Sequence, residues 1–248
     1  GASGTADNTP TTKMTILGNG NVGIGTTPTA VLHLKAGTAT ANTAPLKIND
    51  GVVLSTIEEG TIEKDNNVFY ATPDATSRGL LPAVSYTVNS ATVSLTNGTA
   101  AQSIFTNSQD VLTVAASTAY EFEALYMITG MSGSNRTIST LFALGGGASL
   151  TNIAYEATAT IQSAGTPTAA VTTFSNVNTA SVVTATSSAA IAIIKLKGII
   201  RVNAGGTITP QIQFNTNAPG GSALGQTNSF FKLTPIGSNT MTKIGSWN

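Results

Sequence analysis

The chain has no cysteine and only one histidine, His33, among its 248 residues. The absence of cysteine excludes a disulfide framework, a thiolate metal site and a cysteine nucleophile. One histidine excludes a His-rich metal site within a single chain, and it is the only histidine that a serine nucleophile could use as its base. The composition therefore favours a protein that is not an enzyme and that holds no cofactor and no metal.

Charge is also scarce. Charged residues make up 9% of the chain and the net charge is zero, against roughly 25% charged residues in an ordinary globular protein. A nucleic-acid binder needs a basic patch to neutralise phosphates. The Lys and Arg residues here are scattered, so we expect no nucleic-acid partner. A neutral surface suits a protein whose strand edges are closed off within a stable assembly.

Long apolar runs are missing as well. No segment reaches the roughly 18 uninterrupted apolar residues that a spanning helix needs, so we expect no membrane insertion. Hydrophobic residues nevertheless make up 41% of the chain, which is too many for a disordered protein. The chain begins Gly1-Ala2-Ser3 rather than with methionine, which is typical of a cleaved fragment; whether sequence precedes Gly1 stays open.

What the chain does contain, after about residue 83, is a strict alternation of apolar and polar side chains, which predicts β-strands. The residues expected to face a core are Tyr120, Phe122, Ala124, Tyr126, Ile128, Ala192, Ile194, Leu196, Ile200, Val202, Ile208, Ile212 and Phe214. The opposite faces carry Glu121, Glu123, Lys195, Lys197 and Arg201. Pro210 interrupts one of these runs and predicts an edge strand or a bulge. No convincing helix is found.

The composition and the residue pattern of the sequence change near Pro82. Residues 1–82 hold short strand-like runs separated by turn dipeptides such as Asn19-Gly20, whereas residues 83–248 are rich in Thr, Ala, Val and Ile. We therefore predict two domains, 1–82 and 83–248. Many β-branched strands with Gly and Asn turns between them favour an antiparallel β-sandwich for the second domain.

Three glycines, Gly18, Gly20 and Gly23, stand in the G-x-G-x-x-G spacing of a dinucleotide-binding loop. That loop works only when the glycines open a helix, whose N-terminus holds the pyrophosphate. Here a β-branched stretch containing Pro28 follows, without helical periodicity. We therefore expect a glycine-rich turn between two short strands.

Two further side-chain patterns could carry chemistry. On one strand, Glu121 and Glu123 would point the same way about 6.6 Å apart, which overlaps the carboxylate spacing of inverting glycosidases. The alternative is a solvated strand face opposite a buried aromatic face, which we favour because the flanking sequence suggests no cleft. For His33 we expect a histidine that is satisfied by hydrogen bonds or packed between chains.

The stretch GNGNVGIGTTPTAVLHLKA resembles a motif of bacteriophage tail-fibre and related virion appendage proteins, G-N-V-G-I-G-T-x-x-P-x-x-x-L-H-V. The match runs from Gly20 to Leu34, with Leu34 in place of the usual valine and one residue fewer before Pro28. In those relatives the motif lies in slender, intertwined trimeric β-structure. The resemblance thus implies a homotrimer.

A second element of such proteins resembles residues 58–81, through a G-x-x-E-x-D-x-x-x-F-Y-x-T pattern that ends in Arg-Gly. The residues that match are Gly60, Glu63, Asp65, Phe69, Tyr70, Thr72, Arg78 and Gly79. The region after residue 83 is similar to uncharacterised phage and prophage virion proteins. The resemblance therefore spans most of the chain.

The expected protein is all-β, with a short-stranded trimeric stalk or collar over residues 1–82 and a jelly-roll-like antiparallel β-sandwich head over residues 83–248. By resemblance it is a virion protein in a phage tail or capsid appendage, extracellular once released, with other virion proteins as partners. The function implied is host attachment through a bacterial surface glycan or protein. One alternative is a capsid decoration or head-fibre protein without host binding. The other is a capsule depolymerase that uses Glu121 and Glu123.

Overall fold

The structure is a computed structural model, which describes residues 13–65, 67–106, 109–131, 136–163, 166–167, 171–175, 178, 181–185, 190–215 and 223–240. Within these ranges the regular structure is entirely β-strand, so the all-β prediction is confirmed. The described residues accordingly offer no helix capable of crossing a membrane. The chain divides into two compact units, residues 1–49 and 50–248.

The first unit contains a three-stranded sheet of β1 (Met14–Ile16), β2 (Val22–Ile24) and β3 (Leu32–Leu34). Strand β2 pairs antiparallel with β1 and parallel with β3. A glycine turn joins β1 to β2: the N–H of Gly20 donates to the Leu17 carbonyl at 2.9 Å, and Gly20 has a φ of 89°. The turn leads into a strand, as predicted, and the dinucleotide-loop interpretation lacks its helix.

The second unit opens with a small antiparallel sheet of β4 (Ile62–Asp65), β5 (Val68–Asp74) and β6 (Ser77–Leu81). Alternate residues of β5, Val68, Tyr70 and Thr72, are buried. This sheet ends at Leu81, close to the domain boundary expected after residue 82, but it groups with the residues that follow it. The boundary at residue 82 stays a prediction.

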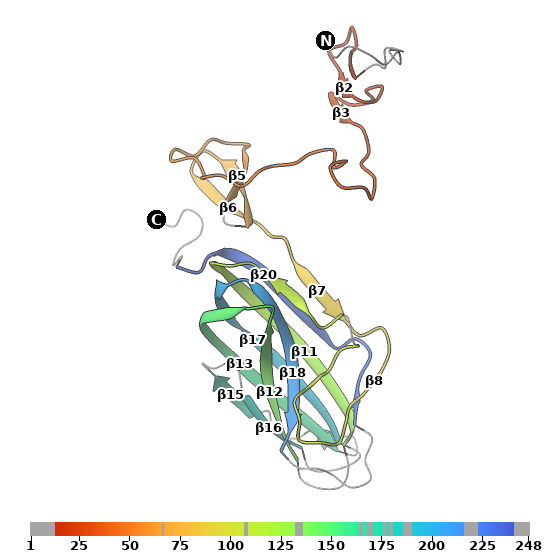
Figure 1. Cartoon of the computed structure of the whole chain (residues 1–248), viewed down its shortest axis with the longest axis vertical. Coiled ribbons are helices and arrows are strands. Elements are labelled where there is room, and N and C mark those ends of the chain that lie inside the picture. The colour runs from red at the N-terminus through yellow and green to blue at the C-terminus, as the bar shows by residue number, and fades with distance from the viewer. Residues whose placement is uncertain are drawn as a thin grey trace. The chain divides into compact units, whose positions relative to one another are not determined.

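The rest of the second unit is built on two antiparallel sheets (Figure 1). The nine-stranded sheet contains β7 (Ser85–Val88), β8 (Val93–Ser94), β11 (Thr118–Met131), β13 (Ser149–Ser163), β14 (Thr166–Pro167), β15 (Val171–Ser175), β17 (Ala190–Ala204), β19 (Leu224–Gly225) and β20 (Phe230–Ser238). The five-stranded sheet contains β9 (Gln102–Ser103), β10 (Leu112–Val114), β12 (Arg136–Gly145), β16 (Ser181–Ala185) and β18 (Gly206–Phe214).

One hydrophobic core joins the two sheets. Every residue that alternation placed inward on β11, β17 and β18 is buried in it. Phe122 of the nine-stranded sheet meets Phe142 of the five-stranded sheet edge to face, with 5.2 Å between ring centroids. Aromatic pairs in this geometry contribute beyond their buried area. The two sheets therefore pack face to face, as expected of a sandwich.

Pro210 lies within β18, which has neighbours on both sides. Strand β12 pairs along one side of it, while on the other side β10 covers positions 206–208 and β9 covers positions 211–212. Pro210 stands at the gap between these two short partners, where its missing N–H costs no ladder hydrogen bond. The strand is interior and its register with β12 shows no shift at Pro210, so the expected edge or bulge is wrong; the gap between the two short partners is the reason that proline is tolerated.

Candidate functional surfaces

The outer face of the nine-stranded sheet carries a row of alternating charges. Strand pairing aligns six outward side chains across six neighbouring strands, from β7 to β15. In order, they are Tyr86, Lys232, Glu123, Lys197, Glu156 and Phe174. We call these six residues the charged row: four alternating charges with an aromatic ring at each end.

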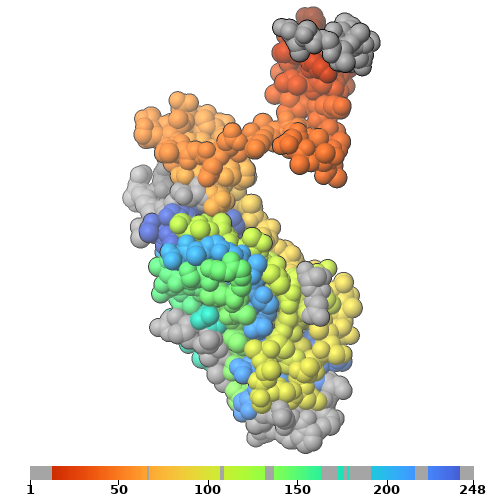
Figure 2. All heavy atoms as spheres, in the orientation of Figure 1, coloured from red at the N-terminus to blue at the C-terminus, as the bar shows by residue number. Residues whose placement is uncertain are grey.

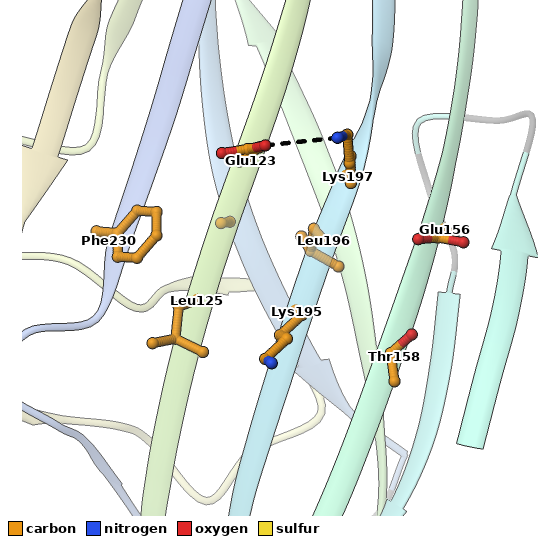
Figure 3. A pocket seen from close by; sticks show the side chains of 9 residues that line it. Glu123, Leu125, Glu156, Thr158, Lys195, Leu196, Lys197 and Phe230 are labelled. Carbon is orange, nitrogen blue, oxygen red and sulfur yellow. Dashed lines mark ion pairs between the residues drawn. The ribbon is translucent and has the colours of Figure 1, made fainter. Parts of the chain in front are cut away.

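Ion pairs connect three members of the charged row across strands, and Figure 3 draws the one between Glu123 and Lys197. The Lys197 ammonium lies 3.6 Å from Glu123 Oε1, and the Lys232 ammonium lies 3.5 Å from Glu123 Oε2. These side chains are at least one-third exposed, so each ion pair contributes at most about 1 kcal/mol. The aromatic ends are more exposed than most rings: Tyr86 is 54% exposed and Phe174 is 68% exposed.

Glu121 and Glu123 do share one face, as predicted, and both approach Lys197. A shallow hollow, open to solvent, lies beside them; its lining includes Glu123, Glu156, Lys195 and Phe230 (Figure 3). A perturbed catalytic carboxyl pair needs an enclosed, desolvating site. This face is solvated, which agrees with the preferred interpretation of a structural charged face.

The three-stranded sheet of the first unit has an apolar face with little covering. Its register brings together the side chains of Met14, Ile16, Val22, Ile24, Leu32 and Leu34. Ile16 is 66% exposed, Leu32 58% and Met14 55%. Figure 2 draws this first unit in red to orange. We call these six residues the apolar face.

The opposite face of the same sheet is small and polar. It carries Thr15, Gly23 and His33. The N–H of Thr29 donates to His33 Nδ1 at 3.3 Å, and the Thr29 hydroxyl lies 3.2 Å from the same nitrogen. A Cβ on Gly23 would meet Pro28 Cδ at 2.8 Å. The loop that carries Pro28 and Thr29 thus packs on this face, and His33 is satisfied within the chain, as expected.

Two residues of the segment 58–81, Glu63 and Arg78, form a structural clamp. Glu63 and Arg78 form an ion pair of 2.9 Å, and their side chains are only 13% and 15% exposed. The N–H of Leu54 donates to Glu63 Oε1 at 2.6 Å, and Arg78 donates to the Leu54 carbonyl at 2.8 Å. The pair therefore fixes the segment around residue 54 against the sheet of β4, β5 and β6.

Two buried tyrosines in the sandwich core differ in their hydrogen bonding. The Tyr155 hydroxyl donates to the Thr140 carbonyl at 3.1 Å, whereas the Tyr126 hydroxyl has no hydrogen-bond partner among the described residues. Burial raises the pKa of Tyr126 far above its ordinary value of 10.0, with a further rise from nearby Tyr155. The Tyr126 hydroxyl therefore stays neutral, as expected of a side chain that packs in a structural core.

Among the described residues, no cluster of three or more His, Asp and Glu side chains could hold a metal ion. Loops carry recognition in sandwich folds, which makes four segments of the sequence eligible: 129–137, 145–152, 163–180 and 215–229. Of these, residues 146–147 form a tight hairpin turn with positive φ at both glycines. Residues 132–135, 164–165, 168–170, 176–177, 179–180 and 216–222 lie outside the described part of the chain.

Alternation along single strands places Glu123 and Lys197 on outward faces, but it does not predict the charged row as a unit. Its order depends on which strands are neighbours and in which register, and alternation along one strand contains neither. Tyr86 and Phe174 lie on short strands without a long alternating run, so no local signal marked them.

No protein-family model matches this sequence, and no curated protein matches it. Among solved structures, the chain is similar to the infectious bursal disease virus VP2 subviral particle, with 14% identity over 83% of this chain and 53% of that chain, at a TM-score of 0.18. The Gt strain of that virus gives 13% identity over 85% of this chain and 60% of that one, at 0.17. The chain thus spans little more than half of these structures, and at such TM-scores they decide nothing about its fold or function.

Proposed function

We propose that the protein is a structural component of a bacteriophage virion appendage, a tail fibre, and that three copies assemble through the apolar face. The single observation that carries this proposal is the apolar face itself. The six strand residues whose side chains point to one side of the first sheet are all apolar, and four of these six side chains are about half exposed or more. The resemblance of residues 20–34 to the fibre motif agrees with it.

The first sheet needs a partner on energetic grounds. Each of its strands has three residues, and so small a sheet is marginal in water unless its apolar side is packed. Burying a large aliphatic side chain contributes about 1.5–3 kcal/mol. Three copies around a shared axis would bury their apolar faces against one another, and no like charges would meet there because the face is uncharged.

In this proposal residues 83–248 form the head, a jelly-roll-like sandwich that binds a bacterial surface glycan or protein. Loops carry recognition in sandwich folds because a rigid scaffold positions them. The chain then serves host attachment, acts on no substrate and sits in the virion beside other structural proteins.

The first experiment is the solution mass of the whole chain by light scattering in about 1 M salt, where the screening length is only about 3 Å and exposed charges contribute little to association. One chain is 25.0 kDa, so we expect about 75 kDa, and we expect this assembly to resist brief warming in detergent. The double variant Ile16→Asn, Leu32→Asn should fall to 25 kDa, because polar amides would have to be buried. Val52→Asn is the matched control, since Val52 is an exposed valine of the second unit and no part of this sheet. A wild-type monomer would remove the proposal's structural support.

Host binding separates the fibre from a capsid decoration protein. A fibre should adsorb to susceptible bacteria and compete with phage attachment, whereas a decoration protein should do neither. The depolymerase alternative makes a different prediction: host capsule would be cleaved by the wild type and spared by Glu121→Gln. Intact capsule after long incubation with the wild type would remove it.

A further inference from the structure

We propose that two copies of the chain pair face to face through the charged row, around a two-fold axis that runs parallel to the strands between β11 and β17. This inference is independent of the trimer proposed above, because it uses a different surface in a different unit. It rests on the order of residues in the charged row. Taken from the opposite end, the row has the same order of aromatic and charged positions, but each charge is replaced by its opposite.

The register fixes that order. From β7 to β15 the row contains an aromatic ring, then Lys, Glu, Lys, Glu, then a second aromatic ring. Its midpoint lies between Glu123 and Lys197. On either side of the midpoint, residues at equal distances carry opposite charges, and the two end residues are both aromatic.

A two-fold axis parallel to the strands turns a facing copy of the row end for end. Glu123 then lies opposite Lys197 of the second copy, and Lys232 lies opposite Glu156 of the second copy. Each of these contacts occurs twice, because an isologous interface repeats every contact. Tyr86 comes opposite Phe174 of the second copy. With the axis perpendicular to the strands, every side chain would face its own copy and like charges would meet.

The next row of outward side chains is also compatible with this two-fold axis. Leu125, Lys195, Phe230 and Thr158 form the next row along the same strands. The same axis places Leu125 opposite Lys195 of the second copy and Phe230 opposite Thr158 of the second copy. In the close-up these side chains lie together beside the Glu123–Lys197 pair (Figure 3). No like charges meet in this row.

Charge complementarity favours a second copy over other occupants. A uniformly acidic or basic partner would meet repulsion at every second position of the row. A neutral ligand would displace the water around four charges and offer none of them an opposite charge beyond the ion pairs of Glu123 within the chain, which is costly. A partner with alternating charges at the strand spacing of about 4.8 Å satisfies all four, and this chain itself carries that pattern. The exposed rings at both ends add apolar area.

The expected affinity is modest. The area of the face follows from the strand geometry. Across the sheet there are six strands about 4.8 Å apart, and along a strand there are five outward positions about 6.7 Å apart. Because the edge strands are short, the face covers roughly 500–600 Å² per copy. The total is then near 1,000–1,200 Å², the lower end of specific interfaces. Pairing should therefore depend on concentration. Packed sheets cross at about 30°, so the two rows diverge toward their ends. The four central charges, rather than the rings at the ends, should therefore decide how the two copies align.

Charge reversal with complementation tests the proposal. Either Glu156→Lys or Lys232→Glu alone would place like charges together twice in a pair of identical copies. An equimolar mixture of the two variants restores opposite charges at both places. We expect each variant alone to raise the dissociation constant at least about tenfold, and the mixture to recover association. The measurement is sedimentation velocity of the whole chain over a concentration series, with circular dichroism to confirm folding.

Two further variants sharpen the result. The double variant Glu156→Lys, Lys232→Glu should pair with itself but not with the wild type, since the swapped charges repel the original ones. Lys195→Glu is the matched control, because its facing residue, Leu125, is uncharged; it should associate like the wild type. Single variants that associate normally, or a mixture that fails to recover, would overturn the proposal. The trimer is tested separately, by the solution mass of the Ile16→Asn, Leu32→Asn variant.

Discussion

At the scale of single residues, Tyr126 and Tyr155 show how one side-chain type can have opposite effects on stability. Both rings are buried in the same core, but the Tyr155 hydroxyl donates to a carbonyl, while the buried Tyr126 hydroxyl has no hydrogen-bond partner among the residues that the structure describes. An unsatisfied buried hydroxyl costs about 1–3 kcal/mol. Tyr126→Phe should therefore raise the free energy of unfolding by about 1 kcal/mol, and Tyr155→Phe should lower it by a similar amount. Urea denaturation of both variants measures this directly; two changes of the same sign would contradict it.

The same burial predicts sensitivity to alkali. Desolvation raises the pKa values of Tyr70, Tyr120 and Tyr126 in the folded protein above the ordinary value of 10.0. The stability linked to these phenols is fully present below about pH 10, the unfolded value, and is lost as the pH rises from there through the folded values. The urea midpoint should thus fall above about pH 10, and Tyr126→Phe should reduce that fall. An identical alkaline loss in the variant would exclude Tyr126 as a contributor.

The Glu63–Arg78 clamp makes a local prediction. Removing Glu63 leaves a largely buried guanidinium without its carboxylate and frees the N–H of Leu54. Glu63→Ala should cost about 2 kcal/mol or more, and limited proteolysis should then cut the segment around residue 54 sooner. Lys64→Ala is the control, because its partner Asp50 is mostly exposed and such a pair is worth less than about 1 kcal/mol. Equal cleavage in both variants would argue against the clamp.

At the scale of elements, Gly198 lets three strands meet in the core. It lies on β17 between Phe122 of β11 and Tyr155 of β13, and the two rings approach across it to 5.9 Å. A Cβ there would meet the Cβ of Tyr155 and lie 2.7 Å from its Cα. A methyl group at this position would push the strands or the rings apart.

Gly198→Ala should therefore lower the free energy of unfolding by about 2–3 kcal/mol through overpacking. Gly79→Ala, on β6, is the matched control, because a Cβ there has open space and alanine should be neutral or slightly stabilising. Thermal unfolding of the two variants decides between packing and a general cost of replacing glycine in a strand.

The same elements show how far the sequence determines the structure. Alternation placed Tyr126, Ile194 and Ile212 in the core correctly, because a period of two depends only on the strand itself. It did not reveal that β3 runs parallel to β2, nor that Pro210 stands at a gap between two short partners. Those features depend on residues far away in sequence. Of the candidate surfaces, the paired glutamates were visible beforehand, whereas the charged row required the register of six strands.

At the scale of the whole molecule, the two proposed contacts should respond to salt in opposite ways. Raising the ionic strength from about 0.1 M to about 1 M shortens the screening length from about 10 Å to about 3 Å. Pairing through the charged row should weaken, while assembly through the apolar face should hold or strengthen. Light scattering at both salt concentrations tests this; a rise in mass with salt for the Ile16→Asn, Leu32→Asn variant would contradict the charged contact.

Strand β20 lies between β11 and β7 and pairs with both, although Phe231 comes more than one hundred positions after its partner Ala124. Folding of the large sheet is therefore slow in principle, because a long loop must close before these contacts stabilise anything. During synthesis, β7 and β11 leave the ribosome well before β20 exists, and they stay available for wrong pairing with other chains. The rate at which residues 230–238 arrive should thus govern how much of the protein reaches its folded state.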